Sequence, residues 1–226
     1  EAPVFSLFPE GLSPIMAMTR LKSLNLSGHI GIRGGGAFGT VQLSCLTHLT
    51  MLNINQTNAA GDTLNGLQAV LQNLVELHAA HLMQYYTEEA HCQAGDVLAK
   101  ALNPERLTFL DLSGSALYGM LPKMQSALSR LTSLRDLRIN GGNVMMASAE
   151  ANLVALQGVV MVLTNLTSLS ISDTAGVFPG FTSVLQLLTD LRRLEVPGIR
   201  GHRALAMRPD DLSALCTSLT CLTALN

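Results

Sequence analysis

The sequence has few aromatic residues, few charged residues and few cysteines. Its 226 residues include no Trp, 6 Phe and 3 Tyr, and 13% of them are charged, about half the share usual in globular proteins. The formal net charge of −2 gives no overall field that would attract nucleic acid or an anionic membrane. The four cysteines form no CxxC pair and lack the density of a disulfide scaffold. These absences exclude a disulfide-rich miniprotein and give no support to nucleic-acid binding.

Long apolar runs are absent as well. A long run without charge, residues 151–172, contains Asn, Gln, Thr and Ser and is too polar to insert into a membrane. The first residues lack the basic and apolar regions of a signal peptide. With the cysteines interpreted as free thiols, the sequence favours an intracellular location. Three glycosylation sequons, which begin at Asn25, Asn55 and Asn165, keep an extracellular location open.

Leucine, in contrast, is abundant and periodic. The chain has 42 leucines, and many of them follow the pattern LxxLxxLxL. The residues that open each LxL pair, here called the anchors, are Leu24, Leu52, Leu77, Leu110, Leu137, Leu169, Leu194 and Leu225. Their spacing is 25 to 33 residues. In most units the LxL pair alternates with polar residues, which predicts a strand with one buried face.

The segments between the anchors carry helix signals, such as Pro122 ahead of Met124 and Leu128. Strands that alternate with helices at this spacing pair in parallel. Because one unit cannot bury its leucines alone, neighbouring units stack into a continuous core.

These motifs resemble the leucine-rich repeat family, from about Met18 onward. The long, irregular repeats are similar to the ribonuclease-inhibitor-like subclass. The resemblance implies an α/β solenoid, or horseshoe, with a parallel β-sheet on the concave face and helices on the convex face. We expect residues 1–17 to form an N-terminal cap or partial repeat. Residues 18–226 are expected to form one domain of about eight repeats that is incomplete at its C-terminal end.

One feature of the family pattern is missing, because no ladder of Asn residues follows the strands. The equivalent positions hold His29, Thr57, Leu82, Ser115, Gly142, Thr174 and Ile199. Leu82, Gly142 and Ile199 cannot bond the turn backbone through their side chains. We therefore expect irregular turns at these three positions.

The resemblance makes the concave sheet the expected recognition surface. The candidate partner-binding residues on it are Asn25, Asn53, Asn55, His78, Phe109, Asp111, Asp136, Arg138, Arg193 and Glu195. Ser168 and Ser170 are likewise expected to face solvent. Asp111, Asp136 and Arg138 gather near the middle, where they either meet a partner or pair with one another.

Two further segments are candidate contact regions. The stretch 83–93 lies in the longest repeat and holds Tyr85 and Tyr86, and Tyr is favoured at protein interfaces. A helix is expected over 148–163, with apolar residues around most of its surface. It either packs unusually deeply or meets another protein.

No motif supports a cofactor, a metal or a catalytic residue. The glycines of 34–39 match GxGxxG but do not follow a strand directly, as a dinucleotide site requires. His78, His81, His91 and Cys92 are close in sequence but lack a paired metal-ligand spacing. No nucleophile, base and orienting group recur in a recognisable order. We therefore expect a protein that is not an enzyme.

The leading hypothesis is a protein–protein interaction module, either a recognition domain or a structural, scaffold-like subunit of a large complex. Its partner would be another protein, and no nucleic acid is expected. The resemblance also leaves two alternatives open. One is a regulator of an enzyme, either an inhibitor or a small-GTPase activator that uses Arg33, Arg138 or Arg200. The other is an extracellular leucine-rich-repeat receptor ectodomain.

Overall fold

Each of the eight predicted anchors lies in a β-strand. The strands are β1 (Ser23–Asn25), β2 (Met51–Asn53), β3 (Glu76–His78), β4 (Phe109–Asp111), β5 (Asp136–Arg138), β6 (Ser168–Ser170), β7 (Arg193–Glu195) and β8 (Ala224–Leu225). They form one eight-stranded sheet in sequence order, and all neighbours are parallel. Every anchor faces the anchor of the next strand, for example Leu110 and Leu137.

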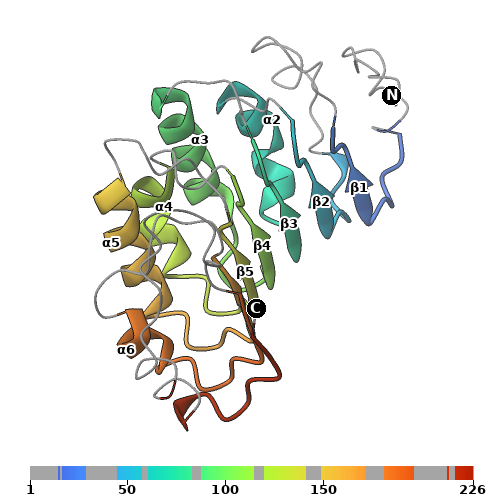
Figure 1. Ribbon diagram of the computed structural model, residues 1–226. Coiled ribbons are helices and arrows are strands. Elements are labelled where there is room, and N and C mark those ends of the chain that lie inside the picture. The colour runs from blue at the N-terminus through green and yellow to red at the C-terminus, as the bar shows by residue number, and fades with distance from the viewer. Residues whose placement is uncertain are drawn as a thin grey trace, which may run out of the picture.

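Helices connect the strands and cover the convex side of the sheet (Figure 1). They are α2 (Gly61–Leu71), α3 (Glu88–Ala101), α4 (Met120–Leu128), α5 (Ala149–Val160) and α6 (Phe181–Leu185). Each of these helices contacts the next one along the chain. The protein is an α/β leucine-rich-repeat solenoid with the sheet on its concave face, which confirms the predicted fold class.

This architecture comes from a computed structural model that describes residues 15, 17–28, 45–57, 61–82, 88–114, 120–140, 149–171, 181–195, 213 and 217–225. The expected cap or partial repeat at 1–17 lies almost entirely outside these residues, as do Gly142 and Ile199. Within the described part of the chain, no helix combines the length and the apolar character needed to cross a bilayer.

The core is a stack of leucines between the sheet and the helices. The anchors of β2 to β7 are completely buried, and so are leucines of the helices such as Leu71 and Leu98. Because the same aliphatic side chain recurs in the same place, successive repeats interlock, and the buried core of the described residues contains no aromatic side chain. This explains how a chain with so few aromatic residues can fold.

The turn that precedes each strand is fixed by its backbone. Within the LxxL segment, the second leucine donates its N–H to the carbonyl of the first, as from Leu134 to Leu131 at 2.9 Å. In every second repeat a threonine hydroxyl adds a bond to the repeat before it, over 3.0–3.2 Å. These donors are Thr50, Thr108, Thr167 and Thr223, and the acceptors are the carbonyls of Lys22, Val75, Arg135 and Arg192.

The turns that follow the first four strands each contain a left-handed residue. Four residues after the anchors of β1 to β4 stand Gly28, Gln56, His81 and Gly114, with φ between +53° and +75°. Each of these residues donates its backbone N–H to the neighbouring repeat. The turn before Leu82 therefore has the same conformation as its neighbours, so the expectation of an irregular turn there is wrong. Leu82 is completely buried, which means that the position of the family Asn is filled here by a core residue.

The helix expected over 148–163 is observed as α5, over Ala149–Val160. It is not buried all round, because Val154 is 60% exposed. Met161 and Val162, directly after the helix, are also about half exposed. The deep-packing alternative is therefore wrong, and the outer side of α5 presents apolar surface to solvent.

Candidate functional site

The centre of the concave face is a stack of side chains from β3, β4 and β5. The ring of His78 lies 4.3 Å from the ring of Phe109, tilted by 33°. The guanidinium of Arg138 lies over the same Phe109, 4.8 Å from the ring centroid. Through Nε and Nη2, Arg138 also donates two hydrogen bonds to the carboxylate of Asp136, each 3.2 Å long. The parallel register brings these residues of three neighbouring strands together.

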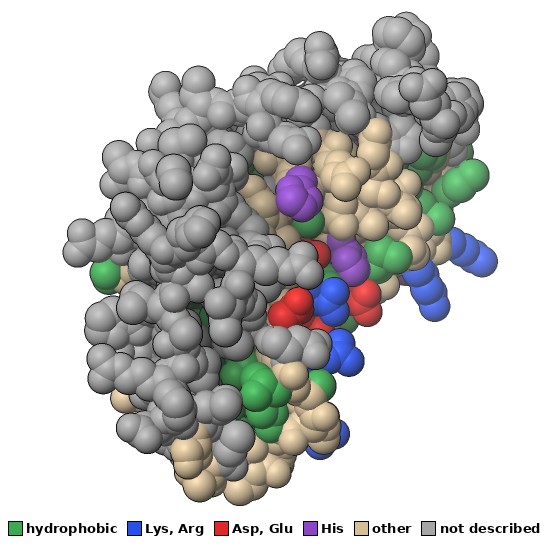
Figure 2. Space-filling view, viewed as in Figure 1, with side chains coloured by type: hydrophobic (Ala, Val, Ile, Leu, Met, Phe, Trp, Pro, Cys, Tyr) green, Lys and Arg blue, Asp and Glu red, His purple; other side chains and the backbone are tan. Residues whose placement is uncertain are grey.

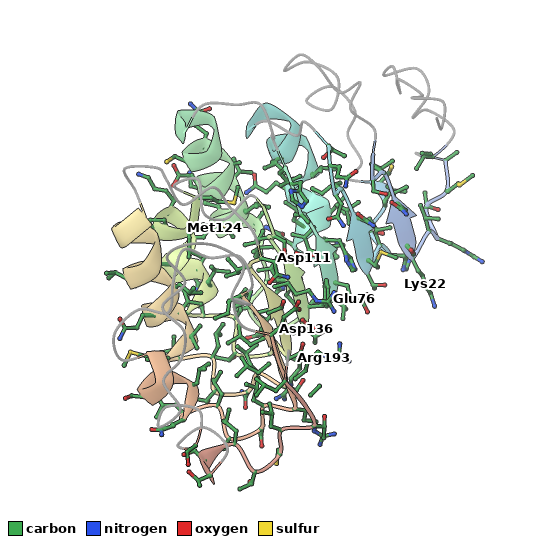
Figure 3. All side chains as sticks on the ribbon, viewed as in Figure 1. Lys22, Glu76, Asp111, Met124, Asp136 and Arg193 are labelled. Atoms are coloured by element: carbon green, nitrogen blue, oxygen red, sulfur yellow. The ribbon has the colours of Figure 1, made fainter. Side chains whose placement is uncertain are left out.

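We call His78, Phe109, Asp136 and Arg138 the central stack. Further carboxylates surround it. Figure 2 shows acidic and basic side chains gathered there, and Figure 3 labels Asp111 on β4 and Asp136 on the neighbouring strand β5. The hydrogen-bonded Asp136 raises the pKa of Arg138, against the opposing effect of partial burial, and the charges of Asp136, Asp111 and Glu195 add to the rise. The alternative that these central charges pair with one another is thus confirmed for Arg138 and Asp136.

Four of the polar candidate residues accept hydrogen bonds from backbone N–H groups. Asn25 and Asn53 each accept a hydrogen bond through Oδ1 from the backbone N–H two residues on, over 2.9 and 3.0 Å. Asp111 does the same for Ser113 at 2.9 Å. Asn55 accepts the N–H of Ala80 in the next repeat at 2.7 Å. These four candidate residues therefore shape the turns after the strands, in addition to forming part of the concave surface.

A second group of polar contacts lies on β6 and β7. The hydroxyl of Ser170 lies 2.6 Å from Glu195 Oε2 and 2.7 Å from Asn140 Oδ1. Because a hydroxyl carries one proton and a carboxylate is a stronger acceptor than an amide oxygen, Ser170 donates its proton to Glu195. Ser170 is only 4% exposed, so the expectation that it faces solvent is wrong, and the same holds for Ser168, which is 9% exposed.

The ten predicted concave residues are therefore spread over the sheet in three groups. Asn25, Asn53 and Asn55 lie at the first strands, the central stack and Asp111 lie on β3 to β5, and Arg193 and Glu195 lie on β7. Tyr85 and Tyr86 lie outside the described residues.

The predicted candidate residues did not include Glu76, whose Oε2 is 3.9 Å from His78 Nε2. They also missed Ser170 and Asn140. All three occupy outward positions of the strand pattern, so the signal was present in the sequence. The contacts that these residues make across strands could not be predicted from the sequence.

The described residues offer no cluster of three or more metal-ligating side chains. His78 belongs to the central stack, while His81 occupies the left-handed turn position after β3. The glycines of 34–39 and the side chain of His91 lie outside the described residues.

The structure also bears on the two alternative functions. Arg138 is held by Asp136 and Phe109, and Arg33 and Arg200 lie outside the described residues. In the sequon at Asn55, Thr57 is buried and its hydroxyl donates to the carbonyl of Ile54. Asn165 Nδ2, where a glycan would attach, donates to the carbonyl of Thr132 at 2.9 Å. These two sequon residues therefore take part in holding the fold.

Comparison with known proteins adds a fold-level likeness only. No model of a protein family matches the sequence, and neither does any curated protein sequence. Among solved structures, the chain is similar to an internalin (inlF) from Listeria monocytogenes, with 18% sequence identity and a TM-score of 0.49. The match covers 95% of this chain and 56% of that chain, so this chain spans about half the length of the internalin structure. We draw no function from a likeness at this level.

Proposed function

We propose that this chain is a non-enzymatic module that binds another protein through the concave face of its sheet. The observation that carries the proposal is the central stack, in which His78, Phe109 and Arg138 support one another. Aromatic residues and arginine are enriched at the energetic centres of protein interfaces.

The state of these side chains before binding supports the same proposal. All three are half-buried rather than fully exposed, and the guanidinium is fixed by two hydrogen bonds to Asp136. Side chains that are already ordered lose less conformational entropy when a partner binds. The central stack is therefore a preformed contact surface.

A role as a structural subunit of a larger assembly is the second candidate, and the outer side of α5 favours it. Val154 on α5 and Met161 and Val162 directly after it expose apolar surface, and α5 lies on the convex side of the sheet (Figure 1). Exposed apolar patches commonly mark contact sites. If this surface contacts another copy of the chain, the wild type should elute from size-exclusion chromatography as an assembly, and replacement of all three residues by Ser should give a monomer. Elution of both proteins as monomers would count against this candidate.

The helices on the convex side and the repeat lengths of 25 to 33 residues support the proposed likeness to the ribonuclease-inhibitor-like subclass. This likeness concerns architecture, and the concave-binding proposal does not depend on it.

Affinity capture with the immobilised chain, from a lysate of the source organism, tests the main proposal. The wild type is compared with the double variant Phe109→Ala/Arg138→Ala and with Lys123→Ala, which changes an exposed residue on α4. We expect a specific protein to be retained by the wild type and by Lys123→Ala, and its retention to fall at least about tenfold in the double variant. Circular dichroism checks that all three are folded. Equal retention by all three proteins, or no specific protein on any of them, would contradict the proposal.

A further inference from the structure

The edge of the sheet at which the strands begin carries a concentration of basic residues. The topology brings together the exposed Arg20, Lys22, Arg106, Arg130, Arg135 and Arg192, which we call the basic edge. These six residues come from the turns before the strands and from the position two residues ahead of the anchors. They are six of the 14 Lys and Arg residues in a chain whose net charge is −2. The positive charge is therefore strongly localised.

The acidic residues of this edge do not neutralise it. The described turns contribute two exposed carboxylates, Glu105 and Asp190, which leaves a formal charge of +4. In the described part of the chain, no salt bridge involves a residue of the basic edge. Arg135 donates to the carbonyl of Asn165, which fixes its position without neutralising its charge. Desolvating these cations is unfavourable unless a partner supplies opposite charge.

The next rows of the concave face have the opposite sign. Glu76, Asp136, Asp111 and Glu195 outnumber Arg138 and Arg193 there. Figure 2 shows basic side chains along the margin and acidic side chains gathered further in, and Figure 3 labels Lys22 of the basic edge. Consecutive residues of a strand are only about 3.3 Å apart, so the two regions of charge lie close together.

We propose that the basic edge binds an acidic polypeptide segment of the protein partner. This inference rests on the proposed function and adds the chemistry of the partner to it. A polypeptide is narrow enough to place carboxylates on the edge while keeping them away from Glu76 and Asp136. A nucleic-acid duplex or an anionic bilayer is broader and would bring negative charge against those carboxylates. The basic edge as described also has no aromatic residue on which a base could stack.

The test uses fluorescence anisotropy of a labelled poly-glutamate peptide of about 20 residues with the full chain. Arg135→Glu/Arg192→Glu is compared with Lys100→Glu/Lys123→Glu, which reverses two exposed charges on α3 and α4. Both double variants have the same net charge, so only the place of the change differs.

Each charge reversal on the edge should weaken binding by on the order of fivefold, which gives at least a tenfold loss for the edge variant. The helix variant should stay within about twofold of the wild type. Binding should also weaken steeply between about 25 and 300 mM NaCl, because the contacts are exposed charges.

Several outcomes would overturn the inference. They are no binding of the peptide at low salt, an equal loss in both double variants, or tighter binding of a single-stranded oligonucleotide or of phosphatidylserine vesicles than of poly-glutamate. A failure here is separable from a failure of the proposed function. If the capture experiment retains a partner that depends on Phe109 and Arg138 while poly-glutamate does not bind, only the inference about the edge is wrong.

Discussion

The guanidinium of Arg138 lies over the ring of Phe109 while its Nε and Nη2 donate to the two carboxylate oxygens of Asp136. Arg138 thus contacts Phe109 of the neighbouring strand β4 and pairs with Asp136 of its own strand β5. Because Phe109 also stacks with His78 of β3, the contact extends over three strands.

The pair Arg138 and Asp136 should show a measurable coupling energy. A double-mutant cycle with Asp136→Ala and Arg138→Ala, followed by urea unfolding, should give about 0.5–1 kcal/mol, as for a partly exposed ion pair with good geometry. A coupling below about 0.2 kcal/mol would contradict the role of this pair in fixing the guanidinium.

The same cycle predicts a lack of pH dependence on the alkaline side. Asp136 raises the pKa of Arg138 through its hydrogen bond, with further help from neighbouring carboxylates. Stabilisation from a raised pKa is fully present below the pKa of the unfolded chain and is lost only as the pH rises through the folded value. Since that range lies above neutrality by several pH units, the coupling energy should be equal at about pH 7 and pH 9. A fall over this interval would show that another group controls the pair.

Truncation of a central anchor should be severe. Leu137 is completely buried in β5, so Leu137→Ala should lower the free energy of unfolding by about 3–4 kcal/mol, through lost burial and the cavity left behind. Leu187, which is 46% exposed, serves as the control, and Leu187→Ala should cost less than about 1 kcal/mol. Urea unfolding measures the free energy of unfolding of both variants. Similar losses in the two would show that the leucine stack is not the source of stability.

The left-handed turn positions offer a matched pair of glycines. Gly28 and Gly114 have φ of +75° and +71°, but a Cβ on Gly28 would meet open space, while one on Gly114 would lie 2.9 Å from Cγ of His81. Gly28→Ala should therefore cost about 1 kcal/mol from backbone strain alone, and Gly114→Ala should cost more. Adding His81→Ala to Gly114→Ala should bring its loss near that of Gly28→Ala in thermal unfolding. No difference between the two single variants would refute the steric contribution of His81.

Replacement of two helical glycines by Ala should change the stability of the chain in opposite directions. On Gly95 of α3, a Cβ would lie 2.9 Å from Cγ and 3.0 Å from the backbone oxygen of Met120, so Gly95→Ala should push α4 away and destabilise the chain by about 1–3 kcal/mol. On Gly158 of α5, the nearest atom is the terminal nitrogen of Gln125 at 2.5 Å, which can move. Gly158→Ala should thus stabilise by roughly 0.5–1 kcal/mol through helix propensity. The melting temperatures of the two variants should shift in opposite directions, and shifts of the same sign would contradict this account.

Sequence reasoning located the strands because the leucine pattern states both the period and the buried face. It also led to the parallel sheet, since every repeat places its anchor in the same way. It did not reveal the left-handed turns, because Gln56 and His81 carry no local signal for that conformation and only Gly28 and Gly114 do.

The members of the central stack were all predicted as candidate residues, but only the charged ones were predicted to lie near one another. Its geometry depends on which side chains meet diagonally across strands, and that follows from the register and from rotamers rather than from composition. The burial of Ser168 and Ser170 could not be read from the pattern either, because alternation gives the face of a strand and not what lies over it.

The sheet keeps one register although the repeats differ in length by up to eight residues. A 25-residue repeat and a 33-residue repeat both place Leu against Leu on adjacent strands. Insertions and deletions are therefore absorbed in the connections between strands. In evolutionary terms, the convex side can lengthen, shorten and diversify while the concave residues keep their mutual positions.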